Sequence, residues 1–170
     1  LEGWLALSEL HQAKKEWRRA LDCIEEAATR GNATAMLLAS GYHLQALGVP
    51  YNREAGVAWL QKAVDIGSAE AMVTLGLYCV EGSIGPDHGP KHAVALFRRA
   101  ADAGDDQGVV YLARQLVKGV GVERDVPEAL DLYRQATKAG NAFAMIEVGK
   151  LYEAGENVPR DMSEALFWFK

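Results

Sequence analysis

The sequence has few of the residues on which disulfide scaffolds, metal centres and redox sites depend. Its 170 residues include only two cysteines and four histidines. Cys23 and Cys79 lie far apart in the chain and lack the C-x-x-C spacing of metal and redox sites. We therefore expect two buried, unpaired thiols, and a fold that does not rely on disulfide bonds.

Long apolar runs and an excess of positive charge are also missing. No apolar stretch approaches the roughly 20 residues that a membrane span requires, so we expect no direct membrane insertion. A net charge of −5 offers no general attraction to nucleic acid, and we expect no nucleic-acid partner. No signal sequence or methionine precedes Leu1, which predicts a processed or cut product that is soluble. The compartment stays open, with the cytoplasm and the bacterial periplasm as the leading alternatives.

The patterns that usually mark catalysis or ligand chemistry are weak or absent. His88-x3-His92, with Asp87 beside it, has tolerable spacing for metal ligands, but it spans Gly89-Pro90 and so does not follow one helical face. Solvated loop histidines are the simpler interpretation. No serine lies in a G-x-S-x-G elbow, and no glycine-rich loop carries the lysine of a phosphate site. We expect no catalytic residue, no metal and no cofactor, and hence a protein that is not an enzyme.

What the sequence does contain is a repeat. Glycines close four apolar helical patterns at intervals of 36, 37 and 36 residues, at Gly31, Gly67, Gly104 and Gly140. An alanine precedes each glycine by four positions, and a helix-capping residue follows it directly, as Asn32, Ser68, Asp105 and Asn141. Such self-similarity is typical of arrays in which one supersecondary unit is copied several times.

Each repeat predicts two helices. Small or apolar residues at the fourth, fifth, sixth and eighth positions after each glycine predict the buried face of a first helix, which we call the A helix. The A helices are expected at about 33–45, 69–81, 106–118 and 142–154. Loops rich in glycine and proline follow, among them 82–90 and 155–159. The second, or B, helices are expected at about 53–66, 90–103, 126–139 and from 162 onward.

Small residues alternate with large ones where the helices should meet. Each B helix carries a small residue followed four positions later by a large one: Gly56/Leu60, Ala93/Phe97, Ala129/Tyr133 and Ala165/Phe169. The ninth position after each glycine is also small, as Ser40, Gly76, Ala113 and Gly149. This alternation predicts that antiparallel helices interlock closely.

The opening segment resembles a tetratricopeptide unit, with helices expected at about 2–13 and 16–30. Its spacing follows W-x2-L-G-x2-Y and A-x3-F-x2-A through Trp4, Leu7, Ser8, His11, Ala20, Ile24 and Ala27. Serine, histidine and isoleucine replace the usual glycine, tyrosine and phenylalanine. His11 and His43 stand where a repeat aromatic packs, so we expect core or groove residues and no catalytic base.

From residue 32 onward the pattern resembles the Sel-1-like repeat family. Family units read A-x3-L-G, an aromatic, G-x-G-V-x2-D, then A-x2-W and K-A-A-x2-G. The matching residues are Ala71, Leu75, Gly76 and Gly82; Gly119, Gly121, Val122 and Asp125; Gly155, Val158 and Asp161; and Trp59, Lys62, Ala63 and Gly67. The chain departs from the family at Gly108, His43, Cys79 and Leu116.

The resemblance implies an all-α fold, a right-handed α-solenoid of antiparallel helix hairpins with a concave trough. We expect one repeat domain over 1–170, made of a tetratricopeptide-like unit at 1–31, Sel1-like repeats at 32–67, 68–104 and 105–140, and a truncated repeat at 141–170. The repeat spacing predicts the closing glycine of the last B helix beyond residue 170, so we expect more protein or a capping helix to follow. The truncated last helix should expose apolar residues, through which two copies of the chain can form an end-to-end dimer.

One stripe of the A helices varies between repeats although packing does not dictate it. We call it the A-helix stripe and expect it to face the concave side. Its candidate partner-binding residues are Leu38, Glu70, Thr74, Leu77, Gln107, Tyr111, Arg114, Lys118, Phe143, Glu147 and Lys150. Apolar side chains are interspersed with charges that change from acidic at Glu70 and Glu81 to basic at Arg114, Lys118 and Lys150.

An apolar row flanked by charge suits a peptide or a helix, because apolar anchors supply binding energy and charges set the register. We therefore expect a non-catalytic scaffold or adaptor that binds a protein or peptide on its concave face. Ordinary variation of a solvent-facing surface remains an alternative. Two further alternatives are carbohydrate or small-ligand binding, with Trp59 or Tyr111 stacking on a sugar, and a regulatory array of a larger enzyme.

Overall fold

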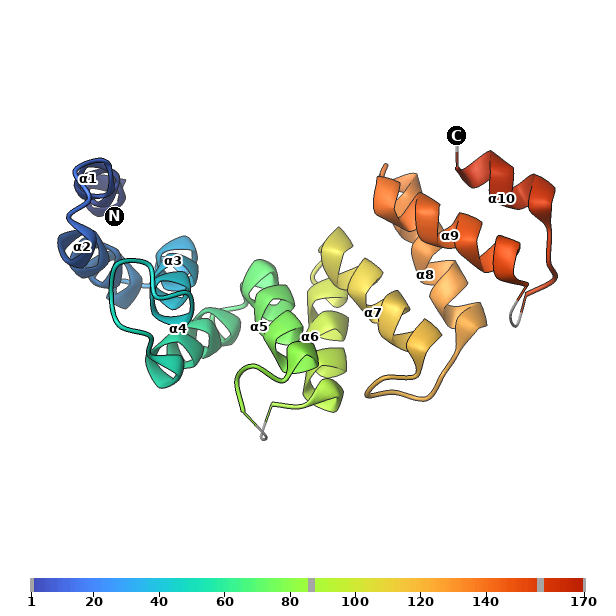
Figure 1. Ribbon diagram of the computed structural model, residues 1–170, viewed down its shortest axis with the longest axis horizontal. Helices are drawn as coiled ribbons and strands as arrows, with labels where there is room; N and C mark the ends of the chain where they lie inside the picture. Colours follow the sequence, from blue (N-terminus) through green and yellow to red (C-terminus); the bar gives the residue numbers. More distant parts are fainter. Residues whose placement is uncertain (1, 86–87, 156–157, 170) are drawn as a thin grey trace. The chain divides into compact units, whose positions relative to one another are not determined.

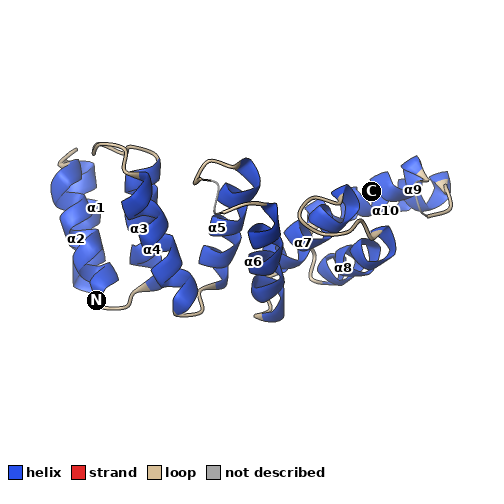
Figure 2. Cartoon of the chain, turned by 90° about the horizontal axis from the view of Figure 1, so that it is seen from below, coloured by secondary structure: helices blue, strands red, loops and turns tan. Residues whose placement is uncertain are grey.

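Helices and the loops between them make up the described part of the chain. The computed structural model describes residues 2–85, 88–155 and 158–169 and contains no β-strand within them (Figures 1 and 2). The helices are α1 Glu2–Ala13, α2 Trp17–Thr29, α3 Ala33–Leu44, α4 Arg53–Asp65, α5 Ala69–Glu81, α6 Pro90–Asp102, α7 Asp106–Lys118, α8 Val126–Lys138, α9 Ala142–Ala154 and α10 Met162–Trp168. The all-α class is confirmed.

The repeat pattern located the helices accurately. Every helix for which the sequence predicts both ends begins and ends within one residue of the prediction. The A helices are α3, α5, α7 and α9, and the B helices are α4, α6, α8 and α10. Of the predicted loops, 82–90 includes Pro86 and Asp87 and 155–159 includes Glu156 and Asn157, and these four residues lie outside the described ones.

The chain forms two compact units, Leu1–Leu75 and Gly76–Lys170, and the division falls within α5. In the first unit α1 packs on α2, α2 on α3 and α3 on α4. In the second unit α6 packs on α7, α7 on α8, α8 on α9 and α9 on α10. Within each unit, these helices pack on their neighbours in sequence, as expected when successive hairpins stack.

A glycine joins each B helix to the next A helix. Gly104 adopts the left-handed conformation with φ of 84°, which a residue without a Cβ reaches without strain. Its N–H donates to Ala101 O at 2.9 Å, and Asp105 N–H donates to Ala100 O at 3.0 Å. These two bonds form the Schellman motif that satisfies carbonyls at a helix C-terminus.

The residue after that glycine also starts the next helix. The Asp105 side chain accepts a hydrogen bond from Gly108 N–H at 2.8 Å and so caps α7. The same combination of a left-handed glycine and a capping residue recurs at Gly31–Asn32, Gly67–Ser68 and Gly140–Asn141. This shared junction explains why the alanine, the glycine and the capping residue return together in the sequence.

Close contacts between helices use the predicted small positions. The Phe97 ring of α6 packs on Gly76 of α5, and the Phe169 ring packs on Gly149 of α9. Phe97 is fully buried. The interlocking of small and large residues is therefore confirmed at these two positions.

One predicted core position is wrong. Ile146 is 44% exposed, whereas Val73 and Val110 at the same position of earlier repeats are buried. Leu37 and Met145 are half-buried. Burial at this position therefore differs between the repeats.

The contact between Gly76 and Phe97 predicts an unusual result for a helical glycine. A Cβ at position 76 would lie 2.5 Å from Phe97 Cε1, so Gly76→Ala should lower the free energy of unfolding by about 1–3 kcal/mol. Urea unfolding followed by far-UV circular dichroism measures the change.

Gly41 is the matched control because it is helical, in α3, and a Cβ added there would meet no neighbouring helix or loop within 4 Å. Gly41→Ala should stabilise the chain by about 0.5–1 kcal/mol, the usual gain for alanine in a helix. If Gly76→Ala stabilised the protein equally, close packing at α5 would be disproved.

Candidate partner-binding site

A hollow of about 230 Å³ lies between the C-terminal half of α5 and α7, within the second unit. Seven residues line it: Leu77, Val80 and Glu81 of α5 and Tyr111, Arg114, Gln115 and Lys118 of α7. Their spacing of three and four residues places each set on one face of its helix. The hollow therefore brings together five residues of the A-helix stripe: Glu81 and the four candidate binding residues Leu77, Tyr111, Arg114 and Lys118.

The walls of the hollow differ in character. Leu77 and Val80 supply aliphatic surface, and the Tyr111 ring stacks on Phe97 with ring centroids 5.4 Å apart. Arg114 and Lys118 lie one turn apart on α7. Neither makes an ion pair or side-chain hydrogen bond with any described residue. Both cations are therefore unpaired within the part of the chain that the structure describes.

Gln115 contributes a buried polar group to the same hollow. Its side chain is 4% exposed, and its Oε1 has no hydrogen-bond partner among the described residues. An unsatisfied buried polar group typically costs about 1–3 kcal/mol, so a wholly structural role would favour an apolar side chain here. The amide is consistent with a role in binding.

Other stripe residues lie outside this hollow. In the second unit, Gln107 is exposed, Phe143 is 41% exposed, and Lys150 Nζ pairs with Glu147 Oε1 at 2.7 Å. In the first unit Leu38 and Glu70 are exposed, and the Thr74 hydroxyl donates to Glu70 O at 2.8 Å. The structure places these seven residues on the A helices without gathering them at one point.

The sequence analysis missed two residues of the hollow, Val80 and Gln115. A signal for Gln115 was present, because the eleventh position after each glycine holds Tyr42, Tyr78 and Leu151 in the other repeats. An amide at a position that is otherwise aromatic or aliphatic is a departure that repeat comparison detects. Val80 differs in that its side chain resembles any surface aliphatic residue.

Arg114 and Glu147 also act on a buried tyrosine. Burial raises the pKa of the Tyr133 hydroxyl, Glu147 raises this pKa further, and Arg114 opposes the shift. The hydroxyl has no hydrogen-bond partner among the described residues. It therefore stays protonated and neutral beneath these two charged side chains.

Two more hollows involve tryptophans of B helices. One of about 350 Å³ in the first unit contains Trp59, and Lys62 Nζ lies 4.0 Å from the centroid of the Trp59 ring. Because an ammonium already covers this ring, sugar stacking on it would require Lys62 to leave. Tyr111 likewise has one face against Phe97. These contacts weigh against the carbohydrate alternative.

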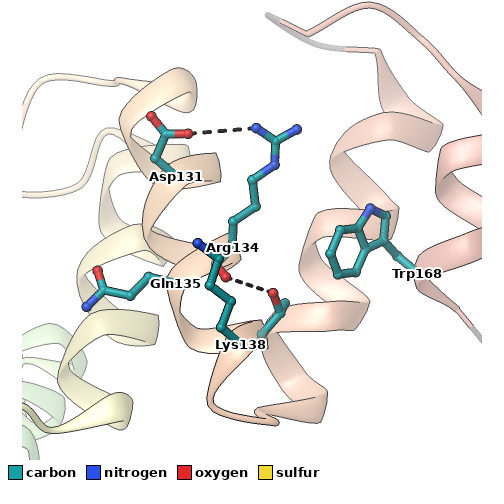
Figure 3. Close-up of a pocket in the computed structure, with 6 residues that line it drawn as sticks. Asp131, Arg134, Gln135, Lys138 and Trp168 are labelled. Atoms are coloured by element: carbon teal, nitrogen blue, oxygen red, sulfur yellow. Dashed lines mark hydrogen bonds and ion pairs between the residues drawn. The ribbon is translucent and has the colours of Figure 1, made fainter.

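The other hollow, of about 440 Å³, lies between α8 and Trp168 of α10 (Figure 3). Its arginine is already engaged, since Arg134 lies 3.8 Å from Asp131 and donates to the Tyr152 hydroxyl at 2.6 Å. Lys138 also lines this hollow and makes no ion pair or side-chain hydrogen bond with a described residue, so the hollow holds one unpaired cation where the α5–α7 hollow holds two.

The histidines lie where packing or a carboxylate explains them. His11 Nδ1 lies 2.6 Å from Glu16 and His43 Nε2 lies 2.9 Å from Glu25. The hydrogen bond from His11 is the main cause of the lowered pKa of Glu16. His88 and His92 meet edge to face at 5.6 Å, while Asp87 lies outside the described residues.

No described group of three or more histidine, cysteine, aspartate and glutamate side chains is arranged to hold a metal ion. Among the helices within residues 2–85, 88–155 and 158–169, none combines the length and apolar character that would let it cross a membrane.

Both cysteines are buried free thiols, as predicted. Burial raises the pKa of Cys79 to about 11 and also raises that of Cys23. The thiolate is the reactive form, so the folded protein should react very slowly with a disulfide reagent near pH 8. A Cys23→Ser variant reports on Cys79 alone.

The expected result is slow labelling of Cys79 in the folded chain and rapid labelling in urea. Because the unfolded thiol ionises near its ordinary pKa of 9, its contribution to stability is present below that pH and is lost as the pH rises toward 11. Rapid labelling of the folded variant would contradict the burial of Cys79.

The junctions and stacked hairpins define the class of protein: an α-helical repeat protein with a candidate binding surface on its A helices. A model of the Sel1 repeat matches residues 33–68, 69–105, 110–141 and 142–170. The chain belongs to the Sel1 repeat family. Proteins of this family generally serve as scaffolds for protein interactions and are typically non-catalytic.

Solved structures support this assignment. A protective antigen of uropathogenic Escherichia coli with an SLR fold is 31% identical in sequence and has a TM-score of 0.81. The match covers 98% of this chain and 36% of the antigen chain. A Sel1 repeat protein from Oxalobacter formigenes is 23% identical, with a TM-score of 0.78, over 97% of this chain and 67% of its own. The α-solenoid class of helix hairpins is thus shared with these relatives.

An immunity protein from Pseudomonas aeruginosa is 23% identical, with a TM-score of 0.59, over 88% of this chain and 55% of its own. This likeness concerns the fold. The chain spans little more than a third of the length of the Escherichia coli antigen. A comparison with curated protein sequences gives no match.

Proposed function

We propose that this chain is a non-catalytic adaptor that binds a partner protein through the A-helix stripe of its second unit. The observation that carries the proposal is the α5–α7 hollow, where aliphatic and aromatic surface lies beside two cations without a protein partner. Apolar anchors beside unpaired charges are the usual elements of a protein-binding surface.

The scaffold role of the family supports this proposal. The exposed Phe143 ring and the Glu147–Lys150 pair extend the proposed surface from the hollow to α9. The stripe residues of the first unit, Leu38, Glu70 and Thr74, belong to the same proposal.

The described chain offers no arrangement that favours a catalytic alternative. Its histidines contact carboxylates or each other, and its thiols are buried with raised pKa values. We therefore propose no reaction for this chain. A regulatory array attached to an enzyme would use the same interaction surface.

A paired substitution tests the proposal. Tyr111→Ala combined with Arg114→Ala should weaken binding of the native partner by tenfold or more, since anchor residues commonly contribute about 2 kcal/mol each. The measurement is capture from the source organism with the chain as bait, followed by quantitative mass spectrometry and titration of the purified partner. Circular dichroism verifies that the fold is intact.

The control removes a tyrosine and an arginine elsewhere in the second unit, through Tyr152→Ala and Arg134→Ala, which contact each other away from the hollow. The control should bind as the wild type does. Equal partner binding by all three proteins would remove the stripe as the binding surface. No stoichiometric protein partner, together with binding on a glycan array, would instead favour the carbohydrate alternative.

A further inference from the structure

We infer that the α5–α7 hollow accepts an acidic side chain of the partner polypeptide, with its carboxylate between Arg114 and Lys118. A neighbouring peptide N–H of the partner donates a hydrogen bond to Gln115 Oε1. The inference rests on the proposed function and specifies the chemistry of the partner at one point of the A-helix stripe.

The size of the hollow favours one side chain over a whole small-molecule ligand. Its volume of about 230 Å³ is below the roughly 300–1,000 Å³ of pockets that enclose drug-sized ligands. Leu77 and Tyr111 can pack against the methylene groups of an inserted residue. The hollow therefore has the dimensions of an anchor position for a polypeptide.

The charges favour an acidic occupant. Arg114 and Lys118 are four residues apart on α7, where like charges repel each other. Glu81 is the single acid that lines the hollow and belongs to the opposite wall, on α5. A carboxylate on the α7 side would relieve the repulsion between the two cations and form charge-assisted hydrogen bonds.

Comparison of the repeats shows that this charge pattern is particular to α7. The tenth and fourteenth positions after each glycine are Gly41 and Gln45, Leu77 and Glu81, Arg114 and Lys118, and Lys150 and Ala154. Two cations occur together only in the third set, which is also the repeat with Gln115. The fold does not require these residues, because the other repeats form the same helix without them.

Gln115 points to a ligand with a hydrogen-bond donor as well as a negative charge. Its side chain lines the hollow, is 4% exposed, and has an oxygen with no partner among the described residues. Rotation about the terminal amide torsion, which is broad, would turn this oxygen toward the hollow. A polypeptide supplies a backbone N–H beside its acidic side chain, whereas a simple anion offers charge without such a donor.

The first experiment compares three pools of fluorescent peptides with blocked ends. The pools are identical except at one central position, which is glutamate, glutamine or lysine. Within each pool, the peptides carry a leucine one, three or four residues from that central position. Fluorescence anisotropy with the full chain should show about tenfold tighter binding of the glutamate pool than of the glutamine pool, the usual effect of a charge-assisted hydrogen bond. Binding of the glutamate pool should weaken as salt is added.

Charge reversal places the effect at the hollow. Arg114→Glu should abolish the preference for glutamate and favour the lysine pool. Lys91→Glu is the matched control, because Lys91 is exposed in the first turn of α6, where a carboxylate suits the helix dipole. The control should keep the wild-type preference.

A second variant separates binding from folding. Gln115→Leu introduces the residue type that the next repeat carries as the buried Leu151. It should raise the melting temperature, because the unsatisfied amide is removed, and weaken binding of the glutamate pool about fivefold, as the loss of one hydrogen bond predicts. A purely structural glutamine would not move these two quantities in opposite directions.

The side-chain NH₂ signals of Gln115 give a local test by NMR. They are identified as the signals that disappear from the spectrum of Gln115→Leu. They should shift when the tightest glutamate peptide is added and stay unchanged with inorganic phosphate. Equal binding of the glutamate and glutamine pools, no binding of either, or unchanged Gln115 signals at saturation would each overturn the inference. If the inference failed in this way while Tyr111→Ala/Arg114→Ala still lost binding of the native partner, the proposed function would stand without it.

Discussion

The junction between each B helix and the next A helix is the constraint on which the rest of the structure depends. A left-handed glycine ends one helix with two hydrogen bonds, and the next residue caps the following helix with its side chain. With only three residues between helices, the direction in which the chain leaves one helix fixes where the next one begins. The junctions bring α3 against α2, α7 against α6 and α9 against α8. Within the α5–α6 hairpin, the small Gly76 admits the Phe97 ring.

Stacked hairpins leave one face of each A helix free of packing demands. Most core positions of the A helices hold apolar residues that neighbouring helices bury. The A-helix stripe is under no such demand, so its residues can differ from repeat to repeat without disturbing the fold. A scaffold family gains binding specificity in this way while its stability stays distributed over the repeats.

The α5–α7 hollow shows how function can depart from the rules of packing. Gln115 keeps an unsatisfied amide where sibling repeats hold tyrosine or leucine, and two cations stand together on α7 without an ion pair to any described residue. Each departure is mildly unfavourable for folding, and all three residues line the same hollow. Unfavourable features such as an unsatisfied amide and neighbouring like charges are expected at sites that interact with other molecules.

The sequence by itself determined the all-α class, the helix ends and the repeat family, because these follow from local signals: the glycine spacing, the capping residues after it and the apolar period of each helix. It also marked the A-helix stripe. Only the tertiary structure decided that Leu77, Tyr111, Arg114 and Lys118 share a hollow and that Val80 and Gln115 complete it, since α5 and α7 belong to different repeats. Such relations depend on how hairpins pack against each other, which a pattern along one helix does not contain.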